Sequence, residues 1–559
     1  MKQSWTFADV VRVKLDIFGC CCPKVWLSQR GPKTSRFPLR SALSSLQKKE
    51  KKMELDWKVC SRARLSRDPR FDGKFFIAVR GSGVYCRPIC PSPTANEKNV
   101  RYFPTAAAAA EAGFRPCLRC RPECSPGTPA WIGTPNTVSR ALRLIGESGL
   151  DGGVEALAQH LGVGSRHLRR LFIRHLGASP NAVAQTRRLH FAKKLIDETM
   201  LSMHEVAIAS GFGCVRRFNA AIRGMYKRTP TQIRRLSRQT GSLPENQYLF
   251  RLRFRPPYDW AGMLDFLKPR ATPGAEEVVD NVYRRSISFR GTSGYFEVSY
   301  EPSHNSLVAK VQFGEPRALF FIIERIRAMF DLNADWSAIA QVLRTDPLLA
   351  ERVKANPGLR VPGCWNGFEL GVRAILGQQI TVKGATGLAG KLASRFGQQL
   401  SSANGLTCVF PEPEVLAEAD IASIGMPQAR VRTIQAFARS VRNNEISFEG
   451  IIDSEVFLDR LCSIAGIGKW TAQYVAMRAL RDPDAFPSGD LGLLRALSLE
   501  SSRELELRAK VWQPWRAYAA MYLWSRPIEG RTRRSKLHSP QGKTAPGDLV
   551  SQPEATAAM

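Results

Sequence analysis

Long apolar runs are missing from this sequence of 559 residues. Because no stretch of about 18 apolar residues occurs, we expect no membrane-spanning helix and no membrane partner. A convincing secretion signal is missing as well, so the 13 cysteines indicate a reducing compartment. Closely spaced cysteines in such a compartment bind metal more often than they form disulfides, and we predict a soluble cytoplasmic protein.

Acidic residues are few: 49 Asp and Glu stand against 82 Lys and Arg, which gives a formal net charge of +33. This imbalance favours a polyanionic partner, with nucleic acid ahead of acidic membrane surfaces. The chain is also too long for one hydrophobic core. At roughly 100 to 200 residues per domain, its length predicts three to five domains.

Changes in composition divide the chain into segments. The basic text "LQKKEKK" closes a leader, and Met53 after it is a candidate start of translation. The stretches "CSPGTPAWIGTP" and "TGSLPENQ" are typical of linkers. We predict an α+β multidomain protein with a disordered leader at 1–52, a cysteine module at 53–128, an all-α domain at 133–240, a small β-rich subdomain at 246–325, a helical body at 326–526 and a disordered tail at 527–559.

Two close cysteine pairs, Cys86-x3-Cys90 and Cys117-x2-Cys120, lie 26 residues apart. Each short loop can turn two sulfurs toward one ion, so the spacing favours a tetrahedral Zn²⁺ site over four unliganded buried cysteines. Between residues 60 and 125 there are 12 Lys and Arg against 5 Asp and Glu. This basic setting favours thiolates and lets a phosphate backbone approach.

The text "FFIAVRGSGVYCRPICPSPT", followed by "NVRYFPTAAAAAEAGFRPCLRCRPE", resembles the N-terminal methyl-acceptor domain of the Ada adaptive-response proteins. The resemblance implies that all four cysteines hold zinc and that Cys86 also takes a methyl group from a DNA methylphosphotriester. Methylation would change the formal charge of the centre from −2 to −1, which lessens the repulsion of phosphates. The alternative is that Cys86 is a structural ligand only.

Two helix-turn-helix signals follow the cysteine module. In "VEALAQHLGVGSRHLRRLFIRHLG" the turn is expected at Gly162–Ser165, and in "MHEVAIASGFGCVRRFNAAIRG" at Gly211–Gly213. The tandem pair, ending in "GMYKRTP", resembles the AraC-type regulator domain, and an ordinary helical domain with a basic face is the alternative. The side chains that we expect to meet DNA are those of Arg166, Arg169, Arg170, Arg216 and Arg217.

A helix-hairpin-helix is predicted in "LCSIAGIGKWTAQYVAMRAL". Glycines allow a tight turn that presents the backbone N–H groups of the second helix, starting near Lys469, to a DNA phosphate. The residues of this clamp are Gly466, Ile467, Gly468 and Lys469.

Asp490 lies 22 residues after Gly468, in "PSGDLG" at the expected start of a helix. A carboxylate suits N-glycosidic bond cleavage because it stabilises positive charge on the sugar and can orient the attacking water. An isolated Asp at a helix start is usually only an N-cap, and its position relative to the hairpin favours the catalytic interpretation.

Trp470 and Tyr474 are four residues apart and can project from one helix face as a stacking wall for a cationic alkylated purine. Core packing is the alternative. The position two residues after Gly468, where bifunctional lyases carry their Schiff-base lysine, is occupied by Trp470, so we predict a monofunctional glycosylase. No four-cysteine cluster signature follows the hairpin, which argues against an iron–sulfur enzyme.

About 280 residues resemble the AlkA-type 3-methyladenine DNA glycosylases, through "PPYDWAGMLDFLKPRA", "LRVPGCWNGFELGVRAILGQQIT", "IGMPQAR" and "GIGKWTAQYVAMRAL". The resemblance implies Asp490 as the catalytic carboxylate and Trp470, Tyr474, Trp524 and Phe266 as the base pocket. It also aligns Gln379 with the residue that wedges into the duplex, with Ile380 beside it. Leu491 stands where an aromatic residue often follows the catalytic Asp.

Together these patterns predict a zinc methyl-acceptor module, a tandem helix-turn-helix domain and a helix-hairpin-helix glycosylase with a β-rich subdomain. We expect a bacterial, nucleoid-associated protein that binds alkylated and promoter double-stranded DNA, with RNA polymerase as a further partner. No "PCHR" motif of the O6-alkylguanine methyltransferase domain occurs. Two alternatives are a regulator whose glycosylase half is a non-catalytic DNA clamp, and an enzyme whose front half only raises DNA affinity.

Overall fold

The computed structural model describes residues 56–126, 136–148, 152–236, 244–403, 405–448 and 454–525. The predictions for the leader at 1–52 and the tail at 527–559 lie outside these ranges. Among the described helices, none combines the length and the apolar character needed to cross a bilayer. The α+β architecture predicted from the sequence is confirmed.

The cysteine module is built on a four-stranded sheet in the order β3-β1-β2-β4, in which only β2 and β4 run parallel. Phe76, Tyr85 and Phe103 turn inward and pack against the alanine-rich helix α2, whose small side chains allow close approach. The elements are α1 (Trp57–Leu65), η1 (Pro69–Phe71), β1 (Phe76–Val79), β2 (Val84–Cys86), η2 (Glu97–Asn99), β3 (Val100–Phe103), α2 (Ala106–Glu111), β4 (Arg115–Pro116) and η3 (Pro122–Cys124).

The next region is entirely helical. Gly162 and Gly211 have positive φ angles, of 61° and 79°, in the two predicted helix-turn-helix turns. Ser202 and Glu205 form a reciprocal capping box at the start of α7. The helices are α3 (Asn136–Ser148), α4 (Gly153–His160), α5 (Ser165–Leu176), α6 (Pro180–Glu198), α7 (Met203–Ala209), α8 (Val215–Tyr226) and α9 (Pro230–Leu236).

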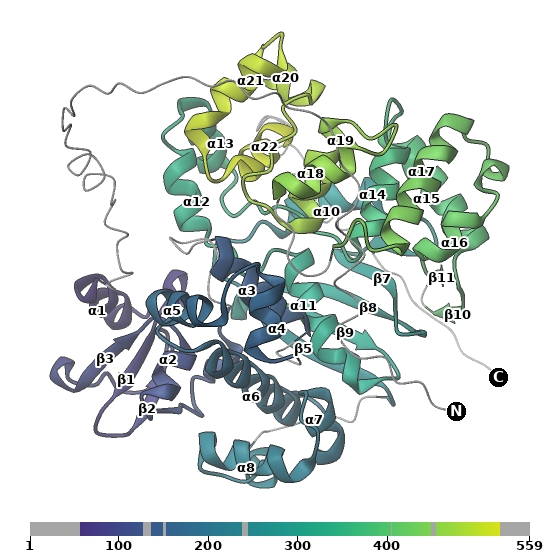
Figure 1. Ribbon diagram of the computed structural model, residues 1–559. Helices are drawn as coiled ribbons and strands as arrows, with labels where there is room; N and C mark the ends of the chain where they lie inside the picture. The colour runs from purple at the N-terminus through teal and green to yellow at the C-terminus, as the bar shows by residue number, and fades with distance from the viewer. Residues whose placement is uncertain are drawn as a thin grey trace, which may run out of the picture. The chain divides into compact units, whose positions relative to one another are not determined.

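A five-stranded antiparallel sheet in the order β5-β9-β8-β7-β6 forms the predicted β-rich subdomain (Figure 1). Alternate residues of β9, Leu307, Ala309 and Val311, are fully buried, as expected of a sheet with one covered face. The elements are β5 (Gln247–Arg253), α10 (Trp260–Leu267), η4 (Lys268–Arg270), β6 (Glu276–Val279), β7 (Val282–Phe289), β8 (Thr292–Glu301), η5 (Pro302–His304), β9 (Ser306–Gln312), η6 (Pro316–Ala318) and α11 (Leu319–Met329).

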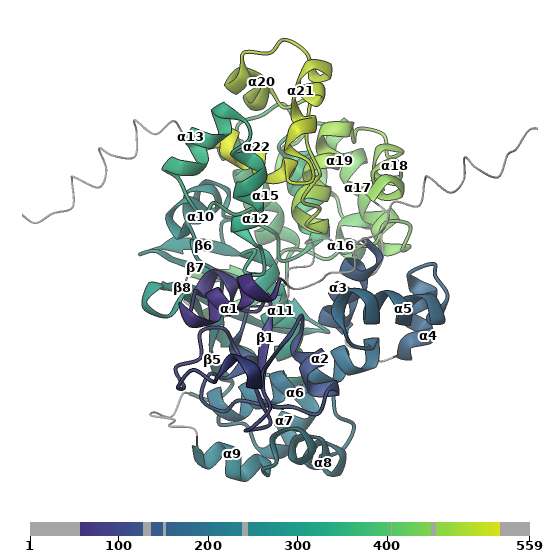
Figure 2. The same ribbon diagram turned by 90° about the vertical axis from the view of Figure 1, so that its left-hand side faces the viewer.

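The helical body follows, with α17, α18 and α19 grouped together (Figure 2). It also contains a two-stranded hairpin, β10 with β11, where the sequence analysis predicted only helix. The elements are α12 (Trp336–Leu343), α13 (Pro347–Ala355), α14 (Gly367–Leu376), α15 (Val382–Phe396), β10 (Gln399–Ala403), β11 (Leu406–Cys408), α16 (Pro413–Glu418), η7 (Ile421–Ile424), α17 (Gln428–Arg442), α18 (Ser454–Cys462), α19 (Lys469–Val475), the π-helical turn η8 (Ala476–Leu480), α20 (Leu491–Leu497), α21 (Ser502–Arg508), η9 (Ala509–Trp512) and α22 (Arg516–Trp524).

Four charged residues, three of them buried and Arg373 partly buried, join the sheet to the helical body, and we call them the charge square. Glu276 of β6 and Arg285 of β7 meet Glu369 and Arg373 of α14, and each arginine contacts both glutamates. The Arg373–Glu276 and Arg373–Glu369 contacts are 2.9 and 3.0 Å long. Burial raises the pKa of Glu276, but the two arginines outweigh it and lower the pKa to about 2, so the carboxylate stays ionised.

Glu369→Gln should destabilise the glycosylase half strongly, because it removes one charge and leaves a buried arginine without its full compensation. Breaking a buried ion pair from one side costs about 3–5 kcal/mol. Urea unfolding followed by circular dichroism would measure the change in the free energy of unfolding.

Glu297→Gln is the matched control, because Glu297 pairs with Arg284 at 3.2 Å on the partly exposed face of the same sheet. Such a pair contributes about 0–1 kcal/mol, so the control should unfold close to wild type. Equal decreases in the free energy of unfolding from the two substitutions would show that the charge square contributes no more to stability than a partly exposed ion pair.

Candidate functional site

The four cysteines predicted to bind zinc converge in the structure. Their sulfurs all lie within 4.8 Å of one another. Cys86 ends β2 and Cys117 directly follows β4, so the parallel pairing of these two strands brings the two cysteine pairs together. Four sulfur donors from two short loops are the donor set of a closed tetrahedral zinc site, and the residues present fit Zn²⁺.

Hydrogen bonds among the four thiols divide them into two kinds. Those with Cys120 and Cys86 lower the pKa of Cys117 to about 6, and those with Cys117 and Cys120 also hold the pKa of Cys90 below its ordinary range, whereas the contact with Cys117 raises the pKa of both Cys86 and Cys120. Cys86, Cys117 and Cys120 are buried, and Cys90 is the most accessible of the four.

Arg87, directly after Cys86, anchors the centre and was not found from the sequence. Its backbone N–H donates to Cys120 Sγ at 3.4 Å, and its Nη1 donates to the Cys120 carbonyl at 3.1 Å. The guanidinium also forms a buried ion pair with Asp72, with Nε 2.8 Å from Oδ1. Asp72 and Arg87 are 15 residues apart, so no local pattern indicates the pair.

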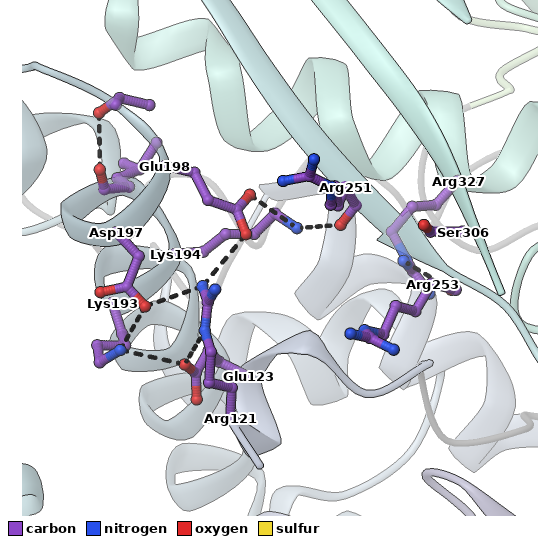
Figure 3. Close-up of polar contacts among 12 residues, drawn as sticks. Arg121, Glu123, Lys193, Lys194, Asp197, Glu198, Arg251, Arg253, Ser306 and Arg327 are labelled. Atoms are coloured by element: carbon purple, nitrogen blue, oxygen red, sulfur yellow. Dashed lines mark hydrogen bonds and ion pairs between the residues drawn. The ribbon is translucent and has the colours of Figure 1, made fainter. Parts of the chain in front are cut away.

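A second charged cluster connects the segment after Cys120 to helix α6 (Figure 3). Arg121 lies 2.8 Å from Asp197 and 3.2 Å from Glu198, and Lys193 lies 3.3 Å from Glu123. Lys193 also pairs with Asp197 one turn away on the same helix. Because opposite charges alternate, the buried groups compensate one another and fix the end of the cysteine module against α6.

The five arginines predicted to contact DNA are all exposed. Arg166, Arg169 and Arg170 lie on α5, and Arg216 and Arg217 lie on α8. The opposite faces of these helices are buried, through Leu168 and Phe172 on α5 and Phe218 and Ile222 on α8. Each second helix of the two motifs therefore presents a basic outer face, as a recognition helix requires.

The hairpin has the predicted form, with α18 ending at Cys462 and α19 beginning at Lys469. Gly466 has φ +93°, and an added Cβ would lie 2.2 Å from Thr433 Oγ1, so only glycine fits. Gly468 is the N-cap of α19 and gives the helix no side-chain cap, which leaves the N-terminus open. Lys469 is exposed, whereas the side chain of Ile467 is buried in the core.

Asp490 is the N-cap of α20 and lies between two tryptophans. Its Oδ1 accepts hydrogen bonds from Leu493 N at 3.0 Å and Trp524 Nε1 at 2.9 Å. Its Oδ2 accepts from Trp470 Nε1 at 2.9 Å. Three N–H donors fix both oxygens of one half-buried carboxylate, so Asp490 is far more constrained than a simple helix cap.

Trp470 and Tyr474 form the predicted aromatic wall, with ring planes 6° apart and centroids 5.4 Å apart. Trp524 meets Tyr474 edge to face at 6.4 Å. Burial raises the pKa of Tyr474, but the charges of Arg478 and Arg270 outweigh it and bring this pKa below its ordinary value.

The ring of Phe266, the fourth predicted pocket residue, is engaged by two cations. The guanidinium carbons of Arg270 and Arg478 lie 4.0 and 5.0 Å from its centroid. A ring that already attracts two guanidinium groups has less attraction left for a cationic base. Arg478 was missed from the sequence, although it lies four residues after Tyr474 and so shares its helix face.

The predicted wedge position lies in the turn between α14 and α15. Gln379 is exposed and has φ +59°, and Ile380 beside it is 38% exposed. Gln378 ties this turn to the hairpin, since its Nε2 donates to the Gly466 carbonyl at 2.9 Å and to Thr471 Oγ1 at 3.0 Å. Gln379 and Ile380 are both exposed in this turn, and the geometry does not distinguish between them as the wedge, which stays a prediction.

The fold and the site define a helix-hairpin-helix DNA glycosylase joined to a cysteine metal-binding module and a helix-turn-helix pair. Four family models match the chain: metal binding domain of Ada at 59–123, helix-turn-helix domain at 157–236, AlkA N-terminal domain at 249–366, and HhH-GPD superfamily base excision DNA repair protein at 372–516. The chain belongs to the family of bifunctional transcriptional activator/DNA repair enzymes of the AlkA type, as its relatives show.

The "probable bifunctional transcriptional activator/DNA repair enzyme AlkA" of Mycobacterium tuberculosis (strain ATCC 25618 / H37Rv) is 39% identical over 483 residues, which are 85% of this chain and 97% of the relative. The "DNA-3-methyladenine glycosylase 2" of Escherichia coli (strain K12) is 30% identical over 279 residues, 49% of this chain and 96% of that protein. A solved structure of a 3-methyladenine DNA-glycosylase from Archaeoglobus fulgidus, 24% identical, covers 49% of this chain and 97% of that chain with a TM-score of 0.45. The family models and the two relatives confirm the family resemblances, and the matched metal-binding domain together with the four convergent sulfurs confirms the zinc-binding module.

Replacing one ligand should abolish stoichiometric zinc binding. Cys117→Ala leaves three sulfurs, too few for a closed structural site, so purified protein should lose most of its roughly one equivalent of zinc. Metal analysis by mass spectrometry measures this directly. Cys214→Ser, at an exposed cysteine outside the cluster, is the control and should keep wild-type zinc. Full zinc content in Cys117→Ala would contradict the four-sulfur site.

Proposed function

We propose that the chain excises alkylated purines, 3-methyladenine and 7-methylguanine among them, from double-stranded DNA by hydrolysis of the N-glycosidic bond. The observation that carries this proposal is the Asp490 carboxylate, fixed by two indole N–H groups beside the stacked pair of Trp470 and Tyr474. The hairpin at Gly466–Gly468 lies directly before this wall on the same chain segment and suits a phosphate of the bound strand. A base inside a duplex is out of reach, so the target must be flipped out.

The residues support a dissociative hydrolysis. The bond between the sugar carbon and the base nitrogen breaks, and the base leaves with the bonding electron pair. Positive charge develops on the sugar, where the Asp490 carboxylate stabilises it. Water then attacks the sugar carbon while Asp490 accepts its proton, which leaves an abasic site and a free base. A purine that carries a positive charge before cleavage departs neutral, so this scheme requires no separate general acid.

The aromatic wall supports selection of cationic bases. The faces of Trp470, Tyr474 and Trp524 are electron-rich, and stacking a cationic purine on them is more favourable than stacking a neutral one. The two cations near Phe266 oppose this preference at that ring, and one of them, Arg478, also lies 5.5 Å from the Tyr474 ring, so we assign selectivity chiefly to the two tryptophans.

Asp490→Asn should abolish base release. The amide keeps the shape of the side chain but carries no negative charge and accepts no proton, so we expect a rate loss of at least about 10³-fold. The assay measures free 3-methyladenine released from methylated DNA under single-turnover conditions. Asp459→Asn, at an exposed carboxylate on α18, is the matched control and should release base at the wild-type rate.

The outcome also separates the alternatives. Wild-type protein that binds methylated DNA yet releases no base would be a non-catalytic clamp. A monofunctional enzyme forms no Schiff base, so borohydride should trap no covalent complex, even though Lys469 is exposed at the start of α19.

For the front half, we propose that Cys86 accepts a methyl group from a DNA methylphosphotriester. The sulfur attacks the methyl carbon, an S–C bond forms, the C–O bond breaks, and the phosphodiester anion leaves. Bound Zn²⁺ would keep the four sulfurs as thiolates. The basic outer faces of α5 and α8 support promoter binding by the same half. RNA polymerase as a partner and a cytoplasmic, nucleoid-associated location are parts of this proposal.

Peptide mass mapping after incubation with methylphosphotriester DNA should show one added methyl group, on Cys86. Cys90 is the most accessible of the four cysteines, so the experiment distinguishes methylation of Cys86 from methylation of Cys90. Methylation on Cys90 would overturn the assignment, and no methylation at all would leave Cys86 as a structural ligand only.

A further inference from the structure

Arg478 is a buried cation in the glycosylase half that the catalytic scheme does not use. It is 5% exposed and lies in the π-helical turn η8, which continues α19 beyond the hairpin. A π-turn widens the helix and is often found where function requires a side chain to be re-aimed. Here the turn carries Arg478 on the segment that also holds Trp470 and Tyr474.

The guanidinium of Arg478 is fixed by three hydrogen bonds. Its Nε donates to the Pro362 carbonyl at 2.9 Å, and its Nη2 donates to the Gly363 carbonyl at 3.0 Å. Its Nη1 donates to Tyr474 Oη at 2.7 Å. Two of these bonds anchor Arg478 to the loop before α14. Because Arg478 is fixed in this way, its third bond restrains the position of the Tyr474 hydroxyl.

Tyr474 in turn contacts both tryptophans of the proposed pocket. It stacks on Trp470 and meets Trp524 edge to face, and each of these indoles donates a hydrogen bond to one oxygen of Asp490. A rotation of the Tyr474 ring would therefore displace both indoles. The position of the Asp490 carboxylate therefore depends on Tyr474 indirectly, through both indoles.

The opposite side of Arg478 faces Phe266. Its guanidinium carbon lies 5.0 Å from that ring and 5.5 Å from the ring of Tyr474, so one cation contacts both aromatic rings. Arg270, 4.0 Å from Phe266, is held in turn by Arg373, which donates to the Arg270 carbonyl. The pocket is thus backed by fixed guanidinium groups rather than by apolar packing alone.

We infer that Arg478 is a positioning residue for base excision, acting through the Tyr474 hydroxyl on the aromatic wall and on Asp490. This inference rests on the glycosidic hydrolysis proposed above. It assigns the hydroxyl of Tyr474 a role that stacking does not need, because a phenylalanine ring would stack equally well. The hydroxyl is the acceptor through which the wall is held.

A double-mutant cycle tests the inference. Arg478→Met and Tyr474→Phe should each lower the single-turnover rate of 3-methyladenine release by roughly 10- to 100-fold, as loss of a charge-assisted hydrogen bond in a catalytic arrangement implies. If both act through the same bond, the double variant should be no slower than Arg478→Met. Arg478→Lys, which keeps one charged donor, should recover part of the rate.

Binding of DNA that carries an abasic-site analogue separates positioning from general damage. This ligand has no base, so its affinity should stay within about twofold of wild type in all four variants. Arg503→Met, at an exposed arginine on α21, is the control and should leave rate and affinity unchanged.

Two results would overturn the inference: a wild-type rate in Arg478→Met, or rate losses that multiply in the double variant. If Arg478→Met fails to fold, Tyr474→Phe decides alone, because it keeps both carbonyl bonds of Arg478, and a wild-type rate would then refute the role of the hydroxyl. Failure of the proposed function itself looks different, since wild-type protein would then release no base.

Discussion

The glycosylase half depends on four charges, three of them buried and one partly buried, that compensate one another. In the charge square each glutamate meets two arginines and each arginine meets two glutamates, so the net charge is zero. Such a set is stable only when complete, because any one charge left alone in the interior is costly. Two members belong to the sheet and two to α14, so completeness also requires one particular placement of the sheet against the helical body. A nonspecific apolar contact would not demand that placement.

The same constraint extends to the proposed base pocket. Arg373, a corner of the square, also holds the carbonyl of Arg270, and Arg270 lies over Phe266. Arg478 also contacts the ring of Phe266, and it donates a hydrogen bond to the hydroxyl of Tyr474. Aromatic rings packed only on one another could slide, since dispersion has little directional preference. Hydrogen bonds from fixed guanidinium groups remove that freedom where Asp490 needs a defined position.

The sequence predicted those parts of the fold and site whose signals are local. The cysteine spacing, both helix-turn-helix turns, the start of α19 and the stacked pair at Trp470 and Tyr474 each lie within a short window, and the structure has them as predicted. The β10–β11 hairpin was not predicted because its strands are short and lie between helices. The roles of Arg87 and Arg478 were not predicted for another reason. Their partners, Asp72 and the carbonyl of Pro362, are 15 and 116 residues away, and no periodicity connects them.

The sulfur cluster and the aromatic wall use arginine in the same manner, although the chemistries proposed for them differ. Arg87 lies beside the sulfur cluster and donates hydrogen bonds to a carboxylate and a carbonyl. Arg478 lies beside the aromatic wall and donates hydrogen bonds to two carbonyls and a hydroxyl. A lysine could not replace either one fully, because one ammonium group cannot reach partners spread along a planar fork. Arginine also keeps its charge when buried, whereas a buried lysine readily loses its proton. Each arginine therefore fixes a neighbour of the proposed reacting group rather than that group itself: Arg87 bonds Cys120, beside Cys86 in the sulfur cluster, and Arg478 bonds Tyr474, which contacts both indoles that donate to Asp490.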